Sequence, residues 1–73
     1  MRYDYSKLMG RIIEKYSTQS NFATAMELSE HSISLKLNCK VGWKQKEISK
    51  ACDLLKISTK EIPNYFFAEK VQN

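Results

Sequence analysis

The feature that most constrains the fold is residues 19–38, QSNFATAMELSEHSISLKLN, which contain two short amphipathic segments separated by three residues. The apolar residues of both segments recur at helical spacing: Phe22, Ala23 and Met26 in the first, Ile33 and Leu37 in the second. Two short helices joined by a tight turn are typical of a helix-turn-helix motif. A small residue such as Ala23 lets such helices cross closely. The alternative is two packed helices of an ordinary small bundle.

The boundaries of these two segments are indicated by capping residues. Ser17 and Thr18 precede a helix expected over residues 19–26, and Ser29 can cap a second helix expected over residues 30–37. The turn between them is Glu27-Leu28-Ser29, and tight turns of this kind place positive φ at the first position. Glu27 would then adopt a left-handed conformation that costs a non-glycine residue about 1–2 kcal/mol.

Two further helices are expected on either side of this unit. Residues 4–16 begin at a good N-cap, Asp4, and carry one continuous apolar stripe. The stripe consists of Tyr5, Leu8, Met9, Ile12, Ile13 and Tyr16. Gly10 within it marks a candidate close crossing. Residues 44–56 carry a second stripe, formed by Ile48, Ala51, Cys52 and Leu55.

The C-terminal region begins at a capping box, Ser58 to Glu61, which indicates the start of another helix. Pro63 is expected to stop or distort that helix after one turn. Residues 65–67 are Tyr-Phe-Phe, and we expect one or two of these rings to close the core and the rest to form a pairing surface. The end, AEKVQN, is expected to be a short strand or a polar tail. Trp43 is expected to pack on the domain, in preference to stacking on a base.

The length of 73 residues favours a single domain that spans residues 1–73. No apolar run approaches a membrane span, and the start MRYDYSK lacks the apolar region of a signal peptide, so a cytoplasmic location is expected. Cys39 and Cys52 match no zinc spacing and are expected to be thiols. A catalytic pair of a cysteine with His31 lacks a third orienting group. We therefore expect no enzyme activity, no metal and no cofactor.

The net charge of +4 comes entirely from residues 36–50, which contain five lysines and one glutamate. The regions on either side each have a net charge of zero. This basic stretch directly follows the second helix of the motif. A solvated lysine face is the simpler interpretation. Because the motif's second helix would enter a DNA groove, contact with phosphates is the preferred one. The candidate phosphate contacts here are Lys36, Lys40, Lys44 and Lys46.

The outward face of the second helix supplies the candidate contacts to DNA bases or to a protein partner: Glu30, His31, Ser34 and Leu35. Ser34 can bond to a base edge, and Leu35 can meet a thymine methyl group. Glu30 would be repelled by DNA unless it accepts from a cytosine amino group. Gln19, at the first position of the preceding helix, could help to hold a phosphate there.

The order of residues extends these motifs into a resemblance over most of the chain, from about Tyr5 to Val71. It comprises Gln19, Phe22-Ala23, Leu28-Ser29, Ile33-Ser34-Leu35-Lys36-Leu37-Asn38, Trp43, Glu47-Ile48, Leu54-Leu55 and Tyr65-Phe66-Phe67. This pattern resembles the lambda-repressor-like helix-turn-helix superfamily. More narrowly, it is similar to small Cro-type regulators of temperate phages of Gram-positive bacteria, a group that includes modulators of repression.

The resemblance implies a compact five-helix all-α domain in which Gln19 and Asn38 hold phosphates. Two residues depart from the family pattern: Glu27 replaces the usual glycine, and Glu30 replaces a neutral polar residue. Both departures bear on operator affinity more than on the fold.

Two functions follow as hypotheses. The first is a Cro-like transcriptional regulator of a phage genetic switch that binds double-stranded operator DNA. The alternative is an antirepressor, or modulator of repression, that binds the phage repressor protein through the same helix-turn-helix face. The two are compatible because a complex could bind DNA jointly, and a homodimer is also considered. We expect DNA binding to be the general function and a repressor protein to share the surface.

Overall fold

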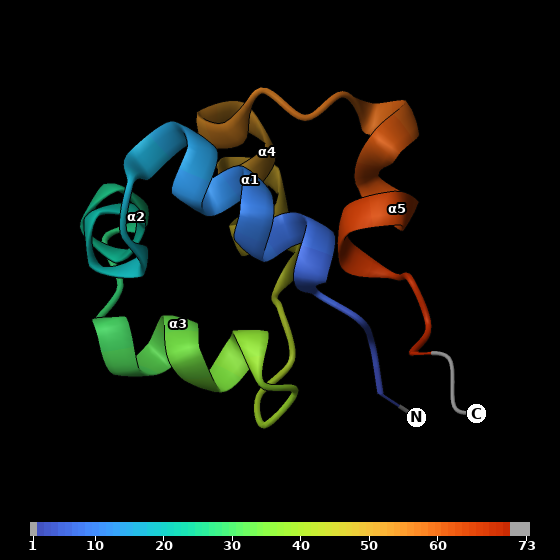
Figure 1. The fold of residues 1–73 in the computed structure, drawn as a ribbon, viewed down its shortest axis with the longest axis horizontal. Coiled ribbons are helices and arrows are strands. Elements are labelled where there is room, and N and C mark those ends of the chain that lie inside the picture. Colours follow the sequence, from blue (N-terminus) through green and yellow to red (C-terminus); the bar gives the residue numbers. More distant parts are fainter. Residues whose placement is uncertain (1, 71–73) are drawn as a thin grey trace.

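Five α-helices and one short 3-10 turn make up the fold (Figure 1). The first helix begins at Ser6, with Tyr5 as its N-cap in place of the expected Asp4. The structure is a computed structural model that describes residues 2–70. Its elements are α1 Ser6–Tyr16, α2 Gln19–Met26, α3 Glu30–Leu37, α4 Gln45–Leu55, the turn η1 Thr59–Glu61 and α5 Ile62–Phe66. The Cα radius of gyration is 11.5 Å, as expected for a compact chain of this length. The expected compact, five-helix all-α fold is confirmed.

Hydroxyl caps start the two central helices at the expected residues. The Thr18 side chain accepts from the amide of Asn21 at 3.0 Å, and Ser29 Oγ accepts from the amide of Ser32 at 3.0 Å. Each bond satisfies an amide that has no partner inside its own helix. The bounds predicted for α2 and α3 are therefore confirmed.

A residue with positive φ lies just after each of the four longer helices, and none of these residues is glycine. The positive φ angles belong to Ser17, Glu27, Cys39 and Lys56, between 57° and 70°. The left-handed conformation predicted for Glu27 is confirmed at φ 62°, ψ 36°. Its amide donates back to the carbonyl of Thr24 at 3.0 Å, which closes the last turn of α2.

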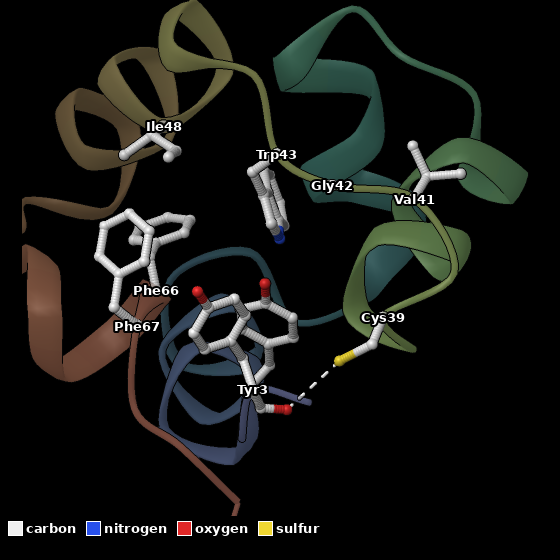
Figure 2. A pocket seen from close by; sticks show the side chains of 9 residues that line it. Tyr3, Cys39, Val41, Gly42, Trp43, Ile48, Phe66 and Phe67 are labelled. Atoms are coloured by element: carbon white, nitrogen blue, oxygen red, sulfur yellow. Dashed lines mark hydrogen bonds between the residues drawn. The ribbon is translucent and has the colours of Figure 1, made fainter. Parts of the chain in front are cut away.

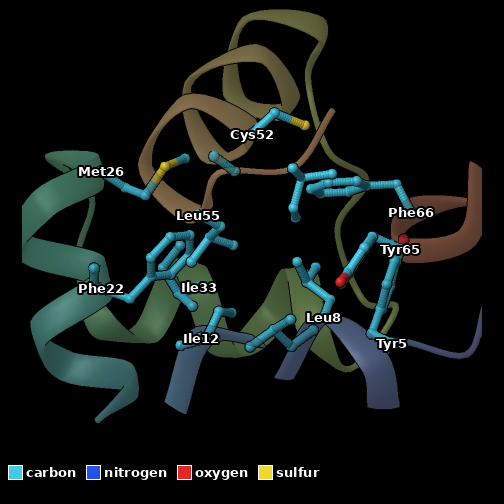
Figure 3. Close-up of a cluster of buried hydrophobic side chains, with 14 residues drawn as sticks. Tyr5, Leu8, Ile12, Phe22, Met26, Ile33, Cys52, Leu55, Tyr65 and Phe66 are labelled. Carbon is cyan, nitrogen blue, oxygen red and sulfur yellow. The ribbon is translucent and has the colours of Figure 1, made fainter. Parts of the chain in front are cut away.

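One core joins all five helices (Figure 3). Its largest fully buried side chains are Phe22, Phe66, Leu8, Ile12, Ile33 and Leu55. Ala23 and Leu37 are buried as predicted, whereas Ile48 only packs against the cluster from a half-buried position. The predicted stripe of α1 is too wide, because Met9 and Ile13 are 39% and 52% exposed. Gly10 marks no close crossing: a Cβ there would meet nothing within 4 Å.

The region after α4 differs from its prediction at Pro63. The capping box forms, with Ser58 Oγ donating to Glu61 Oε1 at 3.2 Å, but it starts only η1. Pro63 then lies in the first turn of α5, so it begins a helix and does not end one. A proline is tolerated there because a first-turn amide has no partner within the helix. Tyr65 and Phe66 close the core as expected, and Phe67 is 48% exposed.

The segments at residues 2–4 and 68–70 lie side by side (Figure 1). Tyr3 and Glu69 form an isolated antiparallel bridge, and the amide of Asp4 donates to the carbonyl of Ala68 at 2.7 Å. The expected C-terminal strand is reduced to this bridge within residues 2–70. Residues 71–73, which include Val71, lie outside the described residues.

A buried ion pair ties α3 to α4. Lys36 Nζ lies 2.9 Å from Glu47 Oε1 and donates to the carbonyl of Gly42 at 3.2 Å. The same glutamate oxygen accepts from the amide of Lys44 at 2.8 Å. Lys36, one of the candidate phosphate contacts, is only 4% exposed and therefore lies inside the domain. The reason is its partner Glu47, which lies on another helix and lets the ammonium group be buried beside the Trp43 ring.

The charge state of Glu47 follows from these contacts. Burial raises the pKa of its carboxyl, but the Lys44 amide and the Lys36 ammonium together outweigh burial and hold the pKa below its ordinary value of 4.5. A carboxyl with a lowered pKa in the folded state stabilises the fold above its unfolded pKa. That stability is lost as the pH falls through the lower, folded pKa.

We predict that Ala23→Leu destabilises the domain by about 1–3 kcal/mol, because Ala23 is 2% exposed in a packed core and extra volume forces its neighbours apart. Urea unfolding followed by circular dichroism measures the change. Thr24→Leu, at an exposed position of α2, is the matched control. An Ala23→Leu protein that unfolds like the parent would contradict the close crossing of α2 with its neighbours.

We also predict that Glu47→Gln lowers the free energy of unfolding at pH 7 by about 3 kcal/mol, because it leaves the buried Lys36 charge uncompensated. In the parent, stability should fall as the pH drops below about 4.5, and the variant should lose less over that range. Urea unfolding at pH 7 and pH 3.5 tests both. The double variant Lys36→Met/Glu47→Gln should be more stable than Glu47→Gln at pH 7. Equal stability of the two variants would argue against a buried charge.

Candidate functional site

The exposed face of α3 has a negative start and an apolar middle. Glu30 and His31 lie in the first turn and are exposed, while Ser34 and Leu35 are half-buried one turn later. Within residues 2–70, no basic group forms an ion pair with Glu30. We call Glu30, His31, Ser34 and Leu35 the α3 face. The four residues predicted as base or partner contacts therefore lie on one helix, although their contacts stay a prediction.

The two residues that flank this helical unit are placed differently. Asn38 Nδ2 donates to the carbonyl of Ser34 at 2.8 Å, so its amide group caps the C-terminus of α3. Any phosphate must compete with that bond for the amide. Gln19 is the first residue of α2 and is half-buried, at the helix N-terminus where a phosphate contact was predicted. Neither predicted phosphate contact is tested by these positions.

Ion pairs reduce the basic stretch to three exposed lysines. Lys36 forms an ion pair with Glu47, and Lys50 forms one with Glu27. The hydrogen bond from Lys50, and then its charge, lower the pKa of the Glu27 carboxyl. Lys40, Lys44 and Lys46 remain exposed, and among the described residues they form no ion pair.

A pocket of about 300 Å³ lies between the α3–α4 loop and the paired chain ends (Figure 2). We call it the Trp43 pocket. The Trp43 ring packs edge-on against Phe66, with ring centroids 5.3 Å apart, and against Tyr5 at 6.4 Å. The expected packing of Trp43 on the domain is thus confirmed. Its Nε1 atom is buried, and no group in residues 2–70 accepts a hydrogen bond from it.

Sequence reasoning missed this pocket because its walls come from four separate parts of the chain. Tyr3 precedes α1, Cys39 and Val41 belong to the loop, Ile48 lies on α4, and Phe67 follows α5. In the sequence, only the aromatic run at residues 65–67 pointed to an apolar surface here. We expected one of its rings to stay outside the core and to form a surface for pairing with another molecule.

The remaining candidate chemistry is sparse. Residues 2–70 contain no group of three or more His, Cys, Asp or Glu side chains placed to hold a metal ion. Cys52 is buried, and burial raises the pKa of its thiol. Within the same residues, no helix has the length and apolar character needed to span a bilayer.

Comparison with known proteins gives a consistent result. A comparison with curated protein sequences found no match. Among solved structures, the chain is similar to the modulator of repression (MOR) of the temperate bacteriophage TP901-1 from Lactococcus lactis, solved in solution. The two are 57% identical, with a TM-score of 0.82, and the match covers 99% of this chain and 97% of the other.

A family model also matches almost the whole chain. It covers residues 1–69 and is described as "Protein of unknown function (DUF739)". The match includes α1 to α5, the α3 face and the loop that carries Trp43. The chain therefore belongs to the DUF739 family, and its fold is that of the TP901-1 modulator of repression.

Proposed function

We propose that this chain is a phage modulator of repression that binds a repressor protein through the α3 face. The observation that carries the proposal is the 57% identity to the TP901-1 modulator of repression over 99% of the chain. A modulator of repression acts on a repressor, so a repressor protein is the partner it implies. This reverses the order of our two hypotheses, because the comparison favours the antirepressor over a Cro-like reader.

The charges of the α3 face support a protein partner. A repressor carries basic groups where it meets DNA phosphates. The exposed Glu30 carboxylate projects from the first turn of α3 and is suited to pair with such a group. Leu35, half-buried on the same face, adds an apolar contact at its centre. Complementary charges of this kind steer association and fix the register of the two proteins.

Burial of Lys36 supports the same choice. Of the four lysines predicted to contact phosphates, the one on α3 itself is inside the domain and paired with Glu47. The reading helix therefore presents a carboxylate and no exposed lysine. Such a surface gains little from the counterion release that drives binding to DNA.

Direct operator binding is the second candidate, with α2, the turn and α3 acting as a lambda-repressor-like helix-turn-helix. The observation that favours it is the exposure of Lys40, Lys44 and Lys46 just after α3. In a joint complex these lysines would contact phosphates beside a repressor. Under either candidate we propose a role in the cytoplasm of the host bacterium, without catalysis.

We predict that Glu30→Gln weakens the complex with purified TP901-1 repressor about fivefold, or about 1 kcal/mol, mostly through a slower association rate at low salt. Surface plasmon resonance at two salt concentrations measures this. Glu14→Gln, which removes an exposed carboxylate from α1, is the matched control and should bind like the parent. Tighter repressor binding by Glu30→Gln would contradict the proposed charge pairing.

The triple variant Lys40→Ala/Lys44→Ala/Lys46→Ala separates the two candidates. Under the proposal, the protein alone does not retard operator DNA at moderate salt, and the triple variant binds repressor as well as the parent does. Direct operator binding predicts retardation by the protein alone, with a salt slope that falls by about three in the triple variant. Gel retardation across a salt series, with and without repressor, gives the answer.

A further inference from the structure

We propose that the Trp43 pocket receives one uncharged apolar side chain of the repressor, and that a backbone carbonyl next to that side chain accepts a hydrogen bond from Trp43 Nε1. This inference rests on the proposed function and deepens it. It names a second contact besides the α3 face and the chemistry that the contact recognises.

The walls of the pocket define the kind of group that fits. Tyrosine, tryptophan, phenylalanine, valine and isoleucine side chains form most of the lining, and none of the lining residues carries a charge at neutral pH. A charged group would lose its hydration there without gaining a partner. The volume of about 300 Å³ suits a large aliphatic or aromatic side chain with part of its backbone.

The Trp43 N–H group supplies a directional requirement. Its nitrogen is buried, and among residues 2–70 no oxygen accepts from it. A buried donor without a partner costs about 1–3 kcal/mol, so an acceptor brought by a bound segment recovers that energy. In Figure 2 the indole nitrogen lies on the edge of the Trp43 ring that faces the tyrosine rings of the lining. Packing on Phe66 and Tyr5 holds the ring in place before binding.

The mouth of the pocket is apolar, and part of it is formed by the loop that follows α3. Val41 and Phe67, both lining residues, are 43% and 48% exposed. The loop that carries Val41 leaves directly from α3, and the carbonyl of Leu35 accepts from the amides of Lys40 and Val41 at 2.8 and 3.3 Å. Figure 1 places α3, this loop and the segments at residues 2–4 and 68–70 on the same side of the molecule. A partner that contacts Leu35 therefore lies within reach of the pocket.

The chain contains a single tryptophan, so the pocket has its own spectroscopic signal. In a ¹⁵N-labelled sample, the only indole N–H resonance belongs to Trp43. We expect unlabelled TP901-1 repressor to shift this resonance downfield at saturation, because a new acceptor deshields the proton. The indole hydrogen should also exchange more slowly with solvent in the complex than in the free protein.

Substitutions at the mouth test whether the pocket contributes to affinity. Val41→Ser and Phe67→Ser remove exposed apolar contacts, so the fold should be retained, and each should weaken repressor binding about tenfold. Ile13→Ser is the matched control, since Ile13 is 52% exposed on α1 and does not line the pocket. The control should bind like the parent. Identical amide spectra away from each substitution verify that the variants are folded.

Three outcomes would overturn the inference, and they differ from one another. If repressor shifts the amides of the α3 face but leaves the indole resonance and the affinities of both mouth variants unchanged, the proposed function stands and the pocket assignment falls. If repressor shifts no resonance, the proposed function fails, and this inference with it. If the indole resonance moves with the concentration of the protein alone, a second copy of this chain occupies the pocket.

Discussion

The buried pair between Lys36 and Glu47 is the interaction on which the functional surface depends. It joins α3 to the start of α4, and its ammonium group also holds the carbonyl of Gly42 in the intervening loop. The loop is therefore fixed at both ends, and Trp43, the next residue, is placed against Phe66. Removing either charge would leave the other buried without compensation and would destabilise the fold. The same change would release the loop that positions Trp43 in the pocket.

The same pair changes the electrostatic character of α3. In sequence, residues 36–50 carry the whole net charge of +4 directly beside α3. In the fold, Lys36 and Lys50 are each matched by a glutamate, one of them Glu27 in the turn before α3. The exposed charge on α3 is then the Glu30 carboxylate and not a lysine. The proposed partner, a basic protein, suits a surface of this kind better than a polyanion does.

Much of the fold could be predicted because its signals are local. Thr18 and Ser29 bond to amides three residues ahead, so the starts of α2 and α3 follow from the sequence alone. The wrong predictions concern residues whose environment is set by distant parts of the chain. Ile13 continues the apolar period of α1, yet no element covers it, and it is 52% exposed. Pro63 was expected to stop or distort a helix, whereas it lies in the first turn of α5, where a proline is tolerated because the first-turn amides have no partner within the helix.

The sequence by itself determined the helix order, most of the core and the residues of the α3 face, because helical periodicity and capping depend on neighbours within about four residues. The tertiary structure alone decided which charges are exposed and where the apolar surface gathers. Lys36 and Glu47 are eleven positions apart, and Tyr3 meets Phe67 across almost the whole chain, with ring centroids 5.9 Å apart. Such pairings depend on how the helices pack, since burial and ion pairing are properties of the assembled core and not of any one segment.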